Sequence, residues 1–281
     1  PAAPTSGQPV KLLAAGAEPR KVLRLHPKAG DKQTLSLTMK MAIETKAGEV
    51  PAPAMKLPVM TLTFDTTVQK VAGNGDITYQ MVMGDIRVSS EPEGSPEVAE
   101  AITKASAGIK GHTSSGLTSD RGFAKELEFK TPPAGSPQAG QLVDQMKDLY
   151  TQLAAPLPEE AVGVGARWEV KTPIKAQGMT MEQTSTYELT ALEGDRFTTK
   201  STLAQRAANQ TIQHPALGGM KMNVTKMNGK GTGQSTFNLN KLLPTVGTGN
   251  VLSEVSMTMN MGGQKQAMTM KTDINLKFES K

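Results

Sequence analysis

The sequence predicts a mainly β (α+β) fold, in which a large curved antiparallel sheet or an incomplete β-barrel carries two packed helices. Three observations support this fold class. Apolar and polar residues alternate through many segments, as a strand with one buried face requires. Turns rich in Gly, Asn and Asp separate these segments. Two Ser-Pro pairs each precede apolar residues at helical spacing, which indicates two helix starts.

Alternation is clearest in two segments. Leu35, Leu37, Met39, Met41 and Ile43 alternate strictly with other residues and predict a strand. Val251–Phe278 predicts a long hairpin, because apolar residues alternate on both sides of a Gly-Gly pair that allows a tight reversal.

The two helices are predicted at 96–109 and 136–154. Ser95-Pro96 and Ser136-Pro137 each supply an N-cap residue followed by proline at the first helical position. The second helix lies within a single β-rich domain, residues 21–281, and divides it into two halves of similar order, 21–135 and 160–281.

Residues 1–20 are predicted to form a disordered tether. Its Pro- and Ala-rich opening, Pro1–Pro9, is typical of the linker that follows an export signal. We therefore expect an exported protein of the periplasm or the bacterial cell surface. A lipid anchor upstream of Pro1 is left open.

The composition limits the chemistry of the chain. Its 281 residues include 17 Met but only 4% aromatic residues, so methionine supplies much of the bulk of a core. The 31 basic and 26 acidic residues are well mixed and give a net charge of +5, which favours a solvated surface over a nucleic-acid site. Cysteine is absent, which excludes disulfides, zinc–thiolate sites and cysteine nucleophiles.

Methionine is concentrated on the alternating faces of the predicted strands. A flexible side chain with a polarisable sulfur adapts to variable apolar shapes, so these residues are predicted to line a cavity for a lipophilic ligand. Two alternatives stay open: an ordinary core in which Met fills gaps, and a copper site built from thioethers, which no histidine accompanies. The predicted ligand-binding residues are Met39, Met41, Met81, Met83, Met257, Met259, Met261, Met268 and Met270.

No catalytic constellation is recognisable. His26, His112 and His214 are scattered, and no Ser or Asp lies at the spacing of a catalytic triad. Gly229–Gly233 lacks the Lys and Ser/Thr spacing of a phosphate loop, so it is interpreted as a turn. We predict that the chain is not an enzyme and uses no metal or cofactor.

Three segments resemble a bacterial family of exported, predicted lipoproteins of unknown function. They are Leu-His-Pro-Lys-Ala-Gly-Asp at 25–31, Val-Gly-Val-Gly-Ala-Arg-Trp at 162–168 and Gly-Lys-Gly-Thr-Gly at 229–233. At the level of the fold, the chain looks like the incomplete β-barrels of bacterial lipoprotein and lipid carriers. That likeness implies an apolar cavity wrapped by a curved sheet, and it does not dictate a function.

These observations favour a non-enzymatic cell-envelope protein that binds a lipid or acyl chain in an apolar, Met-rich cavity. The alternative is a structural or protein-interaction module of the bacterial envelope, which binds no small ligand and docks an envelope protein through strand edges or loops. No nucleic acid is expected as a partner, and contact with a membrane is expected only through an N-terminal lipid anchor.

Overall fold

The structure is a computed structural model that describes residues 10–48, 50–90, 94–129, 156–176, 179–214, 220–261 and 264–281. Its 15 strands belong to one antiparallel sheet, and α1 (Pro96–Ser106) is the one helix among the described residues. The first strands are β1 (Val10–Ala14), β2 (Lys32–Ala47), β3 (Val50–Pro51), β4 (Met55–Lys56), β5 (Val59–Val71), β6 (Ile77–Ser89), β7 (Thr113–Thr118) and β8 (Ala124–Phe129). The others are β9 (Arg167–Ala176), β10 (Met179–Glu193), β11 (Arg196–Ala207), β12 (Gln210–His214), β13 (Met220–Asn238), β14 (Val246–Met261) and β15 (Gln264–Ser280).

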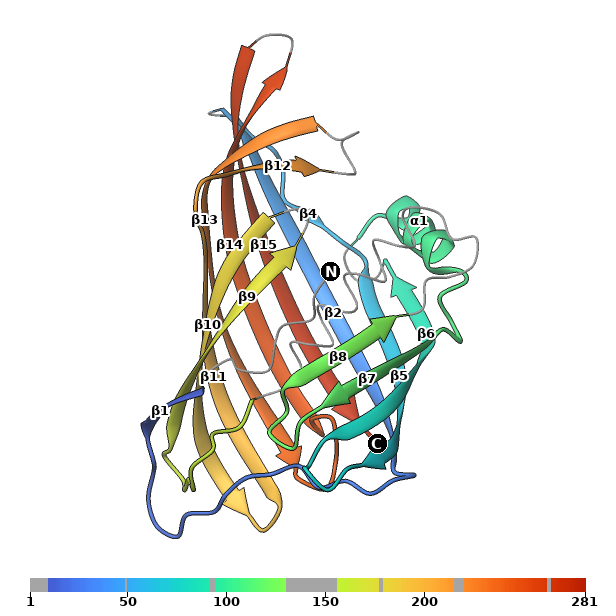
Figure 1. Cartoon of the computed structure of the whole chain (residues 1–281). Helices are drawn as coiled ribbons and strands as arrows, with labels where there is room; N and C mark the ends of the chain where they lie inside the picture. Colours follow the sequence, from blue (N-terminus) through green and yellow to red (C-terminus); the bar gives the residue numbers. More distant parts are fainter. Residues whose placement is uncertain are drawn as a thin grey trace.

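The strand order is β1-β9-β10-β11-β13-β14-β15-β2-β5-β6-β7-β8. The hairpin predicted at the end of the chain is therefore the middle of the sheet, where β14 pairs with β13 and β15 pairs with β2. The short strands β3 and β4 also pair with β2, and β12 pairs with β13. The two margins of the sheet, at β1 and β8, curve toward the same side, so one face is concave (Figure 1).

The predicted fold class is wrong in two respects. The described residues contain one helix rather than two, and the sheet is open, because its marginal strands β1 and β8 do not pair with each other. A segment without strands, residues 15–31, runs between the two margins, and we call it the strap. Its Lys21 forms a bridge with Val162 before β9, and its Leu25 N–H donates to the Asp120 carbonyl beyond β7. The second predicted helix, at 136–154, lies outside the described residues.

The predicted tether does not extend to residue 20, because Val10–Ala14 forms β1. In this strand Val10 pairs with Val170 and Leu12 pairs with Trp168 of β9. Only two apolar residues alternate here, which is too short a pattern to be recognised in the sequence. Tertiary pairing, not local propensity, makes this segment a strand.

Helix α1 begins as the sequence predicts. Ser95 caps it by accepting a hydrogen bond from the Val98 N–H at 3.5 Å, and Pro96 occupies the first turn. The helix ends at Ser106, slightly before the predicted end at 109, and lies against β6.

Three clusters of apolar side chains form the core. The first cluster consists of Leu35, Leu37, Leu62, Phe64, Tyr79, Met81, Met83, Ile109, Leu243 and Phe278. The second consists of Leu23, Leu157, Val162, Ala166, Trp168, Val170, Leu189, Phe197, Phe237 and Leu239. The third, which we call the methionine cluster, consists of Met181, Ile212, Met222, Val224, Met227, Val255 and Met257.

The strap crosses the concave side of the sheet near the end that holds the second cluster (Figure 1). Its Leu23 is completely buried in that cluster, so the face that carries the clusters is the concave one. Asp195, in the turn between β10 and β11, accepts hydrogen bonds from Lys21 Nζ at 2.7 Å and from Asn240 Nδ2 at 2.9 Å. These contacts fix the strap to turns that are distant in sequence.

Candidate functional site

The concave face carries no ionised side chain over the central strands. Successive residues of a strand point to opposite faces, and directly paired residues share a face. Within the described parts of β2, β10, β11, β13, β14 and β15, this alternation places every Asp, Glu, Lys and Arg on the convex face. Lys271 and Glu254, for example, form an ion pair there with Nζ and Oε2 3.9 Å apart. Over these six strands, the sheet is thus charged on the convex face and neutral on the concave face.

The methionine cluster lies at one end of this neutral face. Met222 of β13 pairs with Met259 of β14, and Met257 of β14 pairs with Met268 of β15. Met222 and Met257 are only 2% and 6% exposed, so these two side chains are packed core. Met259 and Met268 are partly buried against the cluster, at its surface.

The structure divides the nine predicted methionines among three places. Met257, Met259 and Met268 belong to the methionine cluster or pack against it. Met81 and Met83 are buried in the first cluster, at a different part of the sheet. Between these two groups, three half-buried side chains lie on the concave face, namely Met39, Met41 and Met270. The side chain of Met261 lies outside the description.

Sequence reasoning missed three methionines of the cluster, Met181, Met222 and Met227. The cause at Met227 is a shift of register between Val224 and Lys226, where β13 bulges against β14. A bulge inserts one residue, so side chains of opposite parity come to share a face. Strict alternation from Met222 would have put Met227 on the convex side.

The middle of the concave face is an apolar strip that is only half covered. Met41 pairs with Ile274, and Ile43 lies two residues along the same strand as Met41. Met270 and Ile274 continue the strip on β15, and all four side chains are half-buried. Partly exposed apolar side chains that adjoin one another mark a surface suited to an apolar ligand.

The glycine-rich segment 229–233 is not the predicted turn, because it lies inside β13. Gly231 pairs with Val251 and Gly233 pairs with Gly249, so β13 and β14 present glycines to the concave face. A Cβ added at Gly231 would lie 2.9 Å from Leu203 Cδ2, which shows that Leu203 of β11 reaches across the glycine. At Gly231 and Gly233, therefore, β13 itself adds no side chain to the concave face.

Titratable side chains do not form a reactive group among the described residues. No three or more His, Asp or Glu side chains of that part are arranged to hold a metal ion. His26 Nε2, in the strap, lies 3.7 Å from Asp195 Oδ1. His112 Nε2 is buried and has no hydrogen-bond partner within the described ranges. Burial raises the pKa of the Tyr187 phenol above its ordinary value, which further disfavours ionisation of this side chain.

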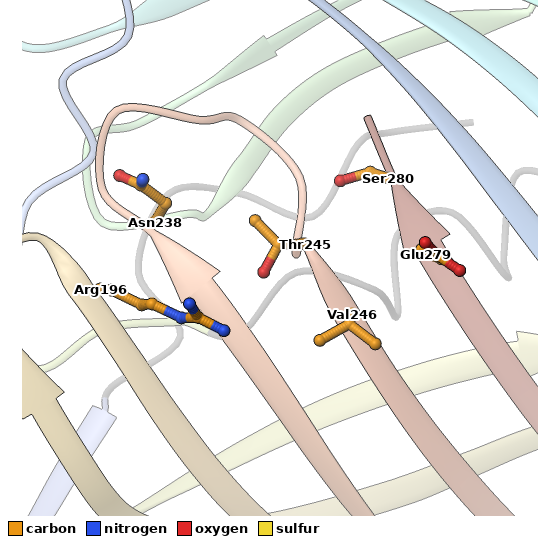
Figure 2. A pocket seen from close by; sticks show the side chains of 6 residues that line it. All are labelled: Arg196, Asn238, Thr245, Val246, Glu279 and Ser280. Carbon is orange, nitrogen blue, oxygen red and sulfur yellow. The ribbon is translucent and has the colours of Figure 1, made fainter.

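A small pocket lined mostly by polar residues lies at one end of the sheet, and most of its residues belong to the convex face. It measures about 560 Å³ including its open mouth, and Figure 2 shows its lining, which is Arg196, Asn238, Thr245, Val246, Glu279 and Ser280. These residues stand at the ends of β13 and β15, at or just before the start of β14, and at the start of β11, which contributes Arg196. The methionine cluster uses the other ends of β13, β14 and β15. None of the predicted ligand-binding residues lines this pocket.

Comparison with known protein families identifies part of the chain. Residues 143–243 match the model of a family of unknown function, DUF6263. The match spans β9 to β13 and two of the three segments that carried the resemblance seen in the sequence. A search of curated proteins finds no match. In the described parts of the chain, no helix is both long enough and apolar enough to cross a membrane.

Proposed function

We propose that the protein is a non-enzymatic protein of the bacterial cell envelope that binds a lipophilic ligand against the concave face of its sheet. The observation that supports this most strongly is the separation of charge between the two faces. A sheet that needed only a filled core would not require an uncharged face with half-buried Met and Ile side chains at its centre. The half-covered strip of Met41, Ile43, Met270 and Ile274 is the proposed contact surface.

The driving force for binding is the burial of apolar surface. Complete burial of a Met or Ile side chain contributes roughly 1.5–3 kcal/mol. Because these four side chains are already half-buried, a ligand that covers them gains roughly 1 kcal/mol from each. Methionine adapts its shape, so we expect broad selectivity for the apolar part of the ligand.

Export to the envelope is part of the same proposal. It is supported by the Pro- and Ala-rich composition of residues 1–9, which is typical of a linker that follows an export signal. A lipid that enters or leaves a membrane would then be the natural ligand.

The first test is native mass spectrometry of the full chain purified from its own host, followed by organic extraction and lipid analysis. We expect a lipid at near-stoichiometric amount. A protein that is empty and that also takes up no Nile red, a neutral apolar dye, would contradict the proposal and favour the interaction module instead.

Two substitutions locate the binding face. Met41→Asp and Met270→Asp each introduce a charge on the neutral strip, and we expect each to reduce dye uptake at least about tenfold, since an unpaired charge next to an apolar ligand is strongly unfavourable. Leu252→Asp is the matched control, because Leu252 is 42% exposed and lies on the convex face of β14. Circular dichroism checks that all three variants fold. Equal effects from the convex and concave substitutions would contradict the proposed site.

A further inference from the structure

One row of polar side chains crosses the apolar concave face. The register of five strand pairs aligns one residue from each of six neighbouring strands, β9, β10, β11, β13, β14 and β15. We call this alignment the polar row, and its members are Thr172, Gln183, Gln205, Gly229, Ser253 and Thr272. Directly paired residues point to the same face, so all five side chains of the row project to the concave side.

Apolar rows flank the polar row on both sides. On the side of the methionine cluster, the next row contains Met227, Val255 and Met270. On the side of the strap, the next row contains Val251 and Ile274. Adjacent rows are two residues apart along a strand, which is about 7 Å. The polar row is therefore a narrow band with apolar surface on either side.

One end of the polar row satisfies its own hydrogen bonds. Gln205 Nε2 donates to Gln183 Oε1 at 2.9 Å, and Gln183 Nε2 donates to Ser185 Oγ at 3.2 Å. The other end does not. Among the described residues, Gln205 Oε1, Ser253 Oγ and Thr272 Oγ1 make no hydrogen bond.

Glycine positions the unpaired groups. A Cβ at Gly229 would lie 2.5 Å from Gln205 Oε1, so the Gln205 carbonyl oxygen lies over the backbone of β13, beside the row position of Ser253. One amide acceptor and two hydroxyls, which both donate and accept, thus adjoin one another on a face that is otherwise apolar. All three residues are half-buried, so a bound molecule can reach them.

We propose that the polar row receives an uncharged hydrogen-bonding group of the lipophilic ligand, with hydrocarbon on both sides of that group. This inference rests on the proposed function and names the ligand class: an ester, amide or secondary alcohol within an apolar molecule, as in a glyceride. Hydrocarbon on one side of the group covers Met227 and Met270, and hydrocarbon on the other side covers Val251 and Ile274. Because the face lacks ionised side chains, an anionic fatty acid or phospholipid head group would be left without a counter-charge there.

The test measures displacement of Nile red from the full chain at pH 8 by three competitors: dioctanoylglycerol, dodecane and dodecanoate. We expect dioctanoylglycerol to displace the dye at about tenfold lower concentration than dodecanoate. Ser253→Ala and Thr272→Val each remove one hydroxyl that makes no hydrogen bond to the described residues, so we expect these variants to fold normally. In each variant, the concentration of dioctanoylglycerol needed to displace the dye should rise about fivefold, which corresponds to the loss of one net hydrogen bond. The concentration of dodecane needed should stay unchanged.

Gln205→Leu removes the whole amide group from the polar row, so we expect a larger effect than from the loss of one hydroxyl. Gln234→Leu, on the exposed convex face of β13, is its control. We expect the first to remove the preference for dioctanoylglycerol and the second to keep it. Suppose that dye binds, but that the three competitors displace it at the same concentrations from wild-type protein and from the Ser253 and Thr272 variants. The inference about the ligand class is then overturned and the proposed function stands. If wild-type protein takes up no dye, both are overturned.

Discussion

Gly163→Ala should detach the strap from the sheet. An added Cβ would lie 1.8 Å from the Ala17 carbonyl oxygen, whereas ordinary contact begins at 3.4 Å. The other near atoms, Ala17 C at 3.0 Å and Pro19 O at 3.1 Å, are also backbone atoms of the strap. No side chain can rotate away to relieve the overlap, so the strap itself must move.

The cost of that movement follows from the contacts around Gly163. Two hydrogen bonds of 2.9 Å would be lost, from Gly163 N–H to the Ala15 carbonyl and from Ala17 N–H to the Val164 carbonyl. At about 0.5–1.5 kcal/mol each, their loss lowers the free energy of unfolding by about 1–3 kcal/mol. If Leu23, which is completely buried, is also drawn out of the second cluster, a further 1.5–3 kcal/mol or so is lost.

Trp168 is a built-in reporter of the strap. It is the single Trp of the chain, is completely buried in the same cluster as Leu23, and donates from Nε1 to the Pro156 carbonyl at 2.9 Å. We expect Gly163→Ala to shift its fluorescence to longer wavelength and to lower the urea midpoint. Gly165→Ala is the matched control: its φ of +83° makes alanine unfavourable by about 1–2 kcal/mol, but nothing lies within 4 Å. The control should lose stability and keep the native Trp168 spectrum. Native fluorescence and wild-type stability for Gly163→Ala would refute the reasoning.

Two further predictions concern the strap and the methionines. Hydrogen bonds from Lys21 and Asn240 hold the pKa of the Asp195 carboxyl below its usual value. The ionised carboxylate therefore stabilises the fold at any pH above the usual pKa. This stabilisation is lost as the pH falls through the lowered pKa of the folded state. Thermal unfolding should therefore show Asp195→Asn to be less stable than wild type at pH 6, with the difference shrinking toward pH 3 or so; a constant difference would contradict this. Met222→Ala should cost about 2–5 kcal/mol because its side chain is packed core, whereas Met41→Ala should cost about 1 kcal/mol or less. If urea unfolding shows the same loss of stability for both variants, Met41 is packed core too, which would contradict an open binding face.

Alternation was sufficient to find most strands, because each has one neutral buried face. Leu35 to Ile43 lies within β2, and the closing hairpin corresponds to β14 and β15. The sequence did not reveal which strands are neighbours. The predicted Met face consequently separates, with Met81 and Met83 packed in the first cluster and Met257 in the methionine cluster.

The site could be predicted only in part, because the sequence does not show which strands are neighbours or in which register they pair. The bulge near Val224 hid Met227, and the polar row depends on the register of five strand pairs, which no local pattern encodes. One signal was available in β15, where every charged residue has an odd number: Lys265, Lys271, Asp273, Lys277 and Glu279. The charged face of this strand could therefore have been assigned before the structure was known. The glycines at 229–233 misled because glycine is more common in turns than inside a strand.

The central position of β15 determines the order in which the sheet can assemble. This strand comes last of the fifteen along the chain, yet it alone joins β14 to β2. Until it is in place, β2 and β14 each expose an unpaired edge beside an apolar face, which is a template for aggregation. The sheet therefore cannot be completed from the N-terminus onward, and its two halves must wait for a segment that leaves the ribosome after both.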